Sequence, residues 1–240
     1  MLYNKGTVGK PASKNERRKI MEERKVNMPL IGEQAPEFTA MTTEGVINFP
    51  ADYKGKWAIL FSHPADFTPV CTTEFMTFAS LQDEFKALNC ELIGLSIDSI
   101  HSHIAWLKKI EEFQWKDIKN VKVKFPVIED VSMNVASKYG MVHDKGGTSA
   151  VRAVFYVDPK GIVRTILYYP ASCGRNFNEL KRILIALQKS DKDGVATPAD
   201  WHPGQDTIIP PPNTVPGANE RLAKEGDNCL DWFLCFRKEK

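Results

Sequence analysis

Residues 61–76 read FSHPADFTPVCTTEFM, and the rest of the chain is organised around them. An apolar run at 57–61 leads into this stretch and has the length of a buried strand. Pro64 and Pro69 then interrupt regular structure. From Cys71 onward, apolar residues recur at helical spacing: Phe75, Phe78, Ala79, Leu81, Phe85 and Leu88. The stretch therefore predicts a strand, a loop and a helix, with Cys71 at or near the start of the helix.

The predicted position of Cys71 favours the thiolate form of its side chain. Backbone N–H groups at a helix N-terminus lack partners within the helix, and together with the helix dipole they attract negative charge. Since the thiolate is the nucleophilic form of cysteine, Cys71 is a candidate catalytic residue. The Thr68 hydroxyl can share a turn with the sulfur, and Pro64 can shield one side from water. The alternative is an inert cysteine, since free cysteine is among the most buried residue types.

The spacing of these residues, P-x-x-x-T-x-x-C, resembles the active-site signature of the peroxiredoxins. The longer run FSHPADFTPVCTTE resembles the subgroup of the alkyl hydroperoxide reductase C/TSA family that includes mammalian peroxiredoxin 6 and the archaeal thioredoxin peroxidases. This resemblance covers residues 28–240. It implies a thiol-dependent peroxidase that reduces hydrogen peroxide and organic hydroperoxides through a sulfenic acid on Cys71. It also implies catalytic roles for Pro64 and Thr68, and no cofactor.

The composition indicates an ordinary globular chain. Its 240 residues, 42% hydrophobic and 26% charged, suffice for one sizeable domain and an appendage. A net charge of +2 gives no indication of a nucleic-acid partner. No segment resembles a signal peptide or a bilayer span, so we expect a cytoplasmic protein without a membrane partner. The five cysteines lack a metal-ligand spacing such as C-x-x-C, so we expect no metal site.

Changes in composition divide the chain into three parts. Residues 1–27 are rich in Lys, Arg and Glu, and we expect a charged N-terminal extension that is flexible. The family resemblance implies a thioredoxin-like peroxiredoxin domain at 28–194. From 195 onward prolines recur and exclude long regular structure. Because TPADWHPG at 197–204 resembles the start of the subgroup's C-terminal dimerisation region, we expect 195–240 to be a dimerisation arm with a resolving-cysteine tail.

The patterns between these limits predict an α/β fold. Strands are expected at 92–97, 125–128, 151–157 and 163–168, with the turn DPKG joining the last two. Pro36 and Phe38 indicate a short edge strand. Helices are expected at 131–139, at 176–189 and after a capping Ser99, the last with an apolar face of Ile104, Leu107, Ile110 and Phe113. With the family resemblance, this order implies a thioredoxin-like fold, a central mixed β-sheet flanked by helices, plus a C-terminal dimerisation arm.

Peroxide chemistry also requires a fixed cation, which stabilises the thiolate and the charge that develops on the leaving oxygen. Arg152 begins an otherwise apolar strand, where burial without a partner would be costly. The alternative is an edge arginine whose charge reaches solvent. The family resemblance implies that Arg152 contacts the Cys71 sulfur and is oriented by Glu74. In YPASCGRNF at 169–177, which resembles the subgroup's YPATTGRNF, Arg175 is a second cation of the pocket or a brace for Glu74.

Three further residues, one of them beside the signature, have open or modest roles. His63 either forms a hydrogen bond in the pocket or packs at an interface, and the sequence favours neither. Cys173 stands where the subgroup has threonine, and we interpret it as a tolerated small side chain. Cys90, beside the apolar run at 92–97, is expected to be a packing residue.

The last requirement of peroxide chemistry is a reaction that reduces the sulfenic acid to the thiol again. Cys229 and Cys235 lie in the aromatic tail NCLDWFLCF at 228–236, which we expect to be buried against another surface. The tail resembles that of archaeal thioredoxin peroxidases, where a C-terminal cysteine of the neighbouring subunit resolves the sulfenic acid. By this resemblance we expect Cys235 to resolve, with Cys229 as the alternative. The resemblance also implies a homodimer that assembles into a decameric ring, and a thioredoxin-like or other thiol reductant.

Other functions are less well supported. A redox sensor or chaperone would not need Thr68 and Arg152 to activate peroxide. A thioredoxin-like disulfide oxidoreductase would have C-x-x-C after the first strand. Some family members have a phospholipase site on a G-x-S-x-G motif, but the corresponding stretch here, YKGKWA at 53–58, contains no serine.

Overall fold

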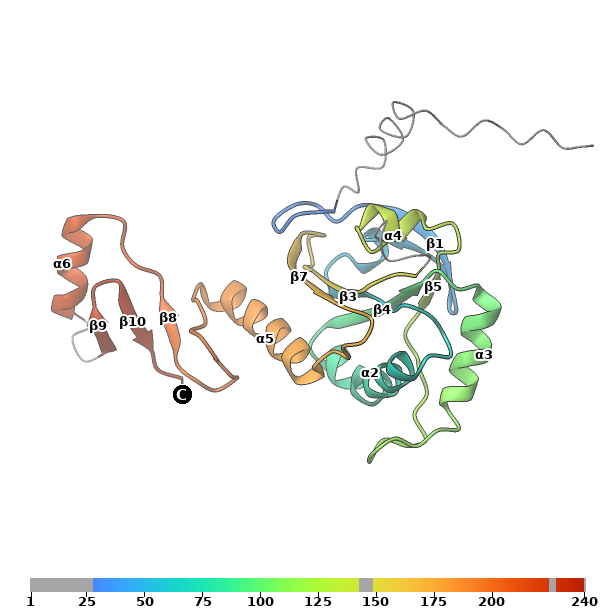
Figure 1. Cartoon of the computed structure of the whole chain (residues 1–240). Helices are drawn as coiled ribbons and strands as arrows, with labels where there is room; N and C mark the ends of the chain where they lie inside the picture. The colour runs from blue at the N-terminus through green and yellow to red at the C-terminus, as the bar shows by residue number, and fades with distance from the viewer. Residues whose placement is uncertain (1–27, 143–148, 225–227, 240) are drawn as a thin grey trace, which may run out of the picture.

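The computed structural model describes residues 28–142, 149–224 and 228–239. The charged N-terminal extension predicted at 1–27 lies outside the described residues. The elements in the first part of the chain form a layered body, and the C-terminal elements lie apart from it at the far end of a long helix (Figure 1).

The body is built on a seven-stranded sheet in the order β2-β1-β5-β4-β3-β6-β7. Strand β3 is parallel to β4, and β4 to β5, whereas the remaining pairs are antiparallel. The predicted α/β architecture with a mixed central sheet is therefore confirmed. The strands are β1 (Phe38–Thr42), β2 (Gly45–Phe49), β3 (Trp57–Ser62), β4 (Cys90–Ser96), β5 (Val127–Glu129), β6 (Arg152–Val157) and β7 (Val163–Tyr169), with a 3-10 turn η1 at Ala51–Tyr53.

The apolar run before the signature is β3, an inner strand of the sheet between β4 and β6. Every residue of β3 is buried, because successive side chains point to opposite faces of the sheet and both faces are covered. Ile59 and Phe61 belong to a core cluster shared with α2, α3 and α5. Leu60 belongs to a second cluster, shared with α4 and the β1–β2 hairpin. The strand that leads to Cys71 is thus fixed from both sides.

The helices start and stop where local chemistry allows. Pro69 occupies the first position of α2, where its missing N–H has no partner to lose. The side chains of Ser99 and Asn176 accept hydrogen bonds from the first turns of α3 and α5. Gly194, at φ +62°, ends α5 in the left-handed conformation. The helices are α2 (Pro69–Ala87), α3 (Ile100–Ile110), α4 (Asn134–Lys138) and α5 (Phe177–Asp193).

Several local predictions were wrong. The buried face of α3 consists of His103, Trp106 and Ile110, whereas Ile104 is exposed. The prediction followed the apolar residues and therefore chose Ile104 instead of its neighbour His103, a polar side chain that is buried in the core. Strand β1 is not at the sheet edge, since it pairs with both β2 and β5. Helix α4 starts only at Asn134, after Met133 adopts a left-handed conformation at φ 57°.

The C-terminal arm is more regular than its prolines predict. It contains β8 (Thr207–Ile209), α6 (Val215–Lys224), β9 (Cys229–Asp231) and β10 (Leu234–Arg237), with a sheet in the order β8-β10-β9. A proline in the first turn of α6 is tolerated because N–H groups there have no partner within the helix. Trp201 is 2% exposed within this one chain, so it needs no partner subunit to be buried, whereas Phe233 is 51% exposed.

None of the helices in the described part of the chain combines the length and apolar composition that crossing a bilayer requires.

Candidate active site

The loop between β3 and α2 holds the signature residues. Pro64 is buried, and Thr68 is the half-buried N-cap of α2. The Thr68 hydroxyl donates to the Ala65 carbonyl at 2.8 Å instead of bonding to the helix. Phe67, which directly precedes Thr68, has a positive φ of 55°, an uncommon conformation for a bulky residue. The loop is therefore tightly folded directly before the helix that contains Cys71.

Cys71 and Arg152 are in direct contact. Cys71 lies in the first turn of α2 and is 0% exposed. Arg152, the first residue of β6, is 2% exposed, and its Nη1 donates to the Cys71 Sγ at 3.3 Å. The other side of the guanidinium is fixed by the Ala171 carbonyl, which accepts from Nε at 3.0 Å and from Nη2 at 2.8 Å. A positive charge is thus held against a buried sulfur, and the alternative of a solvent-facing arginine is wrong.

Glu74 joins two buried arginines. Its Oε2 accepts from Arg152 Nη1 at 2.7 Å and from Arg175 Nη2 at 2.6 Å. Its Oε1 accepts from the backbone N and the Nε of Arg175 at 2.8 and 2.9 Å. Burial opposes ionisation, but the charge of Arg175, the hydrogen bonds from it and the charge of Arg152 prevail, and the pKa of Glu74 lies below its usual value. Of the two roles predicted for Arg175, the structure shows the brace for Glu74.

Arg175 also ties the site to the sheet. Its Nη1 donates to the carbonyls of Ser62 and Ala153 at 3.0 and 3.2 Å, and its guanidinium lies 5.2 Å from the ring centroid of Phe61. Strands β3 and β6 are neighbours, so both carbonyls belong to the same part of the sheet. A buried cation is acceptable here because all these acceptors and a carboxylate surround it.

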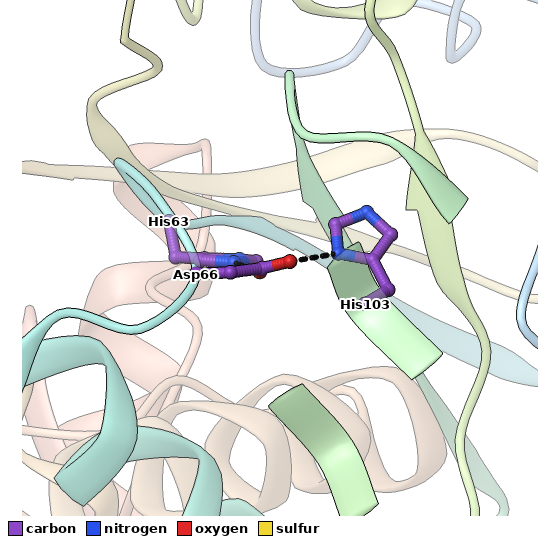
Figure 2. Close-up of side chains that lie close together, drawn as sticks. All are labelled: His63, Asp66 and His103. Atoms are coloured by element: carbon purple, nitrogen blue, oxygen red, sulfur yellow. Dashed lines mark hydrogen bonds and ion pairs between the residues drawn. The ribbon is translucent and has the colours of Figure 1, made fainter. Parts of the chain in front are cut away.

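His63 is buried and forms a hydrogen bond with Asp66, and its role in the pocket stays a prediction. Its Nε2 lies 2.9 Å from Asp66 Oδ1, and the other carboxylate oxygen lies 2.8 Å from His103 Nδ1 (Figure 2). Burial lowers the pKa of His63, more than the contact with Asp66 raises it. The sequence analysis missed Asp66 and His103. Asp66 lies within the signature stretch, but nothing in the spacing indicated that His103 faces it.

The same three side chains are the described residues whose potential metal ligands cluster, with ligand atoms all within 4.8 Å of one another. His63, Asp66 and His103 are all buried. In this structure the ring nitrogens that face Asp66 are engaged in hydrogen bonds with its carboxylate.

The tail cysteines are paired with each other. Cys229 and Cys235 form a disulfide with a Cα–Cα distance of 4.0 Å, across the β9–β10 hairpin. Cys235 is fully buried. Of the free cysteines, Cys90 is buried, which raises the pKa of its thiol and fits the predicted packing role, and Cys173 is exposed. In this state neither tail sulfur is linked to Cys71.

Comparisons with known proteins agree with this geometry. Residues 31–166 match the AhpC/TSA family, and residues 186–225 match the C-terminal domain of 1-Cys peroxiredoxin. A peroxiredoxin of Methanosarcina mazei is 65% identical, covering 88% of this chain and 99% of its own length. One of Aquifex aeolicus is 50% identical, covering 89% and 98%.

Solved structures give the same result. A yeast mitochondrial 1-Cys peroxiredoxin is 44% identical with a TM-score of 0.77, covering 88% of this chain and 100% of its own. Peroxiredoxin 6 of Arenicola marina, as a cysteine-to-serine mutant, is 30% identical with a TM-score of 0.75, covering 88% and 99%. The predicted thioredoxin-like fold is thereby confirmed. From its sequence, its fold and its buried cysteine–arginine contact together, the chain belongs to the AhpC/TSA family of peroxiredoxins, which are thiol-dependent peroxidases.

Proposed function

We propose that this peroxiredoxin reduces hydrogen peroxide and small organic hydroperoxides at Cys71. The thiolate attacks the terminal peroxide oxygen, an S–O bond forms, and the O–O bond breaks. The leaving oxygen takes a proton and departs as water or an alcohol, and Cys71 becomes a sulfenic acid. The observation that supports this best is the 3.3 Å contact between Arg152 Nη1 and the Cys71 sulfur in a buried site.

The neighbouring residues support distinct parts of this step. Arg152 stabilises the thiolate and the charge on the leaving oxygen, and a preorganised group does this without reorganisation cost. Glu74 and Arg175 hold Arg152 in place. The Thr68 hydroxyl uses its proton on the Ala65 carbonyl, so its oxygen is left as an acceptor for a peroxide proton. Pro64 shields the site from water.

For the return step we propose that Cys235 of another subunit resolves the sulfenic acid, with Cys229 next in a relay. The Cys235 thiolate attacks the oxidised sulfur of Cys71, water leaves, and an intersubunit disulfide forms. Cys229 then attacks Cys235, which releases the Cys71 thiolate and leaves the Cys229–Cys235 disulfide, the pairing present in this structure. A thiol reductant completes the cycle by reducing that disulfide. Direct resolution by Cys229 is the alternative.

The partners that fit this cycle are a thioredoxin-like or other thiol reductant and further copies of the chain. The yeast relative resolves its thiol via glutathione and thioredoxin systems, which supports such a reductant. The arm exposes Leu230, Trp232 and Phe233, at 80%, 39% and 51%, and Trp232 lines a hollow of about 490 Å³. Exposed apolar side chains of this kind favour a homodimer, and we extend the proposal to a decameric ring and a cytoplasmic location.

The test of the reaction is Cys71→Ser, because a serine hydroxyl stays protonated at neutral pH and cannot replace a thiolate. Steady-state peroxide consumption with a thiol reductant should disappear in this variant. Cys90→Ser is the matched control, since that thiol is buried away from the arginines, and its activity should persist. Substantial turnover by Cys71→Ser would refute the assignment.

A further inference from the structure

The loop that holds Pro64 and Thr68 is fixed at one residue, Asp66. Its two carboxylate oxygens bond to His63 Nε2 at 2.9 Å and to His103 Nδ1 at 2.8 Å (Figure 2). Its backbone N–H donates to Asp98 Oδ2 at 2.9 Å. The side chains of both histidines are 0% exposed and that of Asp66 is 1% exposed. Asp66 therefore connects the loop to α3 and to the end of β4 without help from water.

The partners determine where the protons lie. The Nε2 of His103 faces the Ile128 carbonyl at 3.0 Å, and a carbonyl can only accept. Burial alone would raise the pKa of Asp66, but hydrogen bonds from His103 and His63 lower it well below its usual range, so the carboxylate is also only an acceptor. The hydrogen bonds at 2.8 and 3.0 Å fix the His103 ring between Asp66 and the Ile128 carbonyl.

The other histidine differs in its hydrogen-bond partners. His63 donates from Nε2 to Asp66, and its Nδ1 has no hydrogen-bond partner in the described part of the chain. A neutral ring with its one proton on Nε2 satisfies both facts. Asp66 thus selects the tautomer of His63. The His63 ring lies 4.7 Å from that of Phe75, which is one helical turn after Cys71, and 5.1 Å from that of Trp106.

The group is positioned to control the geometry of the site. Asp66 lies between Pro64 and Thr68, and the carbonyl that accepts from Thr68 belongs to Ala65, its neighbour. The next residue, Phe67, has a positive φ, and strained backbone of this kind persists only where its surroundings over-determine it. The hydrogen bonds that Asp66 accepts from His63 and His103 constrain the buried part of this loop.

We propose that Asp66 and His103 are positioning residues, whose hydrogen bond holds residues 63–68 in the conformation that places Pro64 and Thr68 before Cys71. This inference rests on the peroxidase reaction proposed above. Neither residue touches the sulfur or the peroxide. Both act through the loop, and a displacement of the loop by about 1 Å can slow a reaction about 10²-fold.

Two matched substitutions at His103 separate positioning from folding. In His103→Asn the amide nitrogen takes the place of Nδ1 and still donates to Asp66. In His103→Gln the amide reaches the place of Nε2 and donates to the Ile128 carbonyl, but Asp66 loses its partner. Both remove the buried ring, so both lower the melting temperature. His101→Gln, on the exposed side of the same helix, controls for changes to α3 itself.

The measurement is the second-order rate constant of reduced enzyme with hydrogen peroxide in stopped flow. We expect His103→Gln to lose about 10- to 100-fold, with His103→Asn close to the wild type and His101→Gln unchanged. Equal rate constants in the two His103 variants, whether both high or both low, would overturn the proposal. A wild-type enzyme that consumes no peroxide would instead refute the proposed function.

A second measurement tests the proton positions without any variant. Neutron diffraction from crystals of the reduced full-length protein should show a proton on Nδ1 of His103 and one on Nε2 of His63, both directed at the Asp66 carboxylate. A His103 Nδ1 without a proton, or a proton on Nδ1 of His63 in place of Nε2, would overturn the proposal. So would a zinc ion bound between the two rings after soaking, since the ring nitrogens that face Asp66 could not then donate to it.

Discussion

The sharpest test of the arginine–glutamate arrangement is the substitution Glu74→Gln. Glu74 is 2% exposed and accepts from both Arg152 and Arg175. Glutamine has nearly the same shape but no charge, and its amide NH₂ cannot accept from a guanidinium. Two buried cations would then share one neutral oxygen. Removal of one partner from a buried ion pair costs about 3–5 kcal/mol. For a chain of this size, each kcal/mol lowers the melting temperature by about 2–4 °C.

The expected fall in melting temperature is therefore about 6–20 °C. The matched control is Glu84→Gln, on the same helix, where the carboxylate pairs with Lys181 at the surface. Surface pairs contribute at most about 1 kcal/mol, so this variant should remain near the wild type. Denaturant unfolding of reduced protein at one fixed protein concentration provides the free energies, since assembly would otherwise change the apparent stability.

The pH dependence of stability provides a further test, because its direction follows from the pKa shift of Glu74. Folding lowers the pKa of Glu74 below its ordinary value of about 4.5. Its carboxylate therefore stabilises the folded state at pH values above about 4.5. That contribution is lost as pH falls below 4.5 through the folded value. The difference between wild type and Glu74→Gln should thus be full at pH 7 and shrink in acid. A Glu74→Gln variant as stable as Glu84→Gln, or a difference that does not change in acid, would refute the reasoning.

Arg152→Met should keep the fold but slow the reaction with peroxide by about 10²–10³-fold, which is the usual loss when one preorganised electrostatic group is removed. An unchanged stopped-flow rate constant would mean that Arg152 has only a structural role. After one equivalent of peroxide, Cys229→Ser should accumulate an intersubunit dimer on a non-reducing gel, because no second thiol releases Cys71 from Cys235. Cys235→Ser should show no such band, and the opposite pattern would make Cys229 the resolving residue. Trp232→Ala should weaken self-association in sedimentation, and a stable, active wild-type monomer at micromolar concentration would contradict the dimer.

The central part of the fold could be predicted because its signals are local. Strand β3 is apolar from Trp57 to Phe61, since both of its faces are covered, and α2 starts at Pro69, a residue that the first turn of a helix accepts. The contact of Cys71 with Arg152 joins residues far apart in sequence, and neither periodicity nor spacing predicts it. It was expected only because the signature resembles that of a known family.

The buried histidine–aspartate group shows what sequence patterns miss. Pattern analysis assigns the inward face of a helix from its apolar residues, and this led to Ile104 rather than His103. His103 points from α3 into the protein core because Asp66 and the Ile128 carbonyl both bond to it. These partners come from other parts of the chain. The regular structure of the arm was missed for a similar reason. Its strands exist only through pairing with each other, which prolines in the connecting segments do not prevent.

The hydroxyl of Thr68 is turned away from the helix that it precedes, and this has a consequence for the timing of the cycle. A threonine at the N-cap stabilises a helix by about 1 kcal/mol when its side chain bonds to the first turn, and α2 lacks that contribution. The first turn, which buries Cys71, is therefore less stable than a fully capped turn would be. For the cycle proposed above we infer that opening of this turn exposes the sulfenic acid to a resolving thiol, whereas closure leaves it to a second peroxide molecule. The side chain proposed to serve the substrate in one half of the cycle would then also influence how quickly the enzyme leaves its oxidised state in the other half.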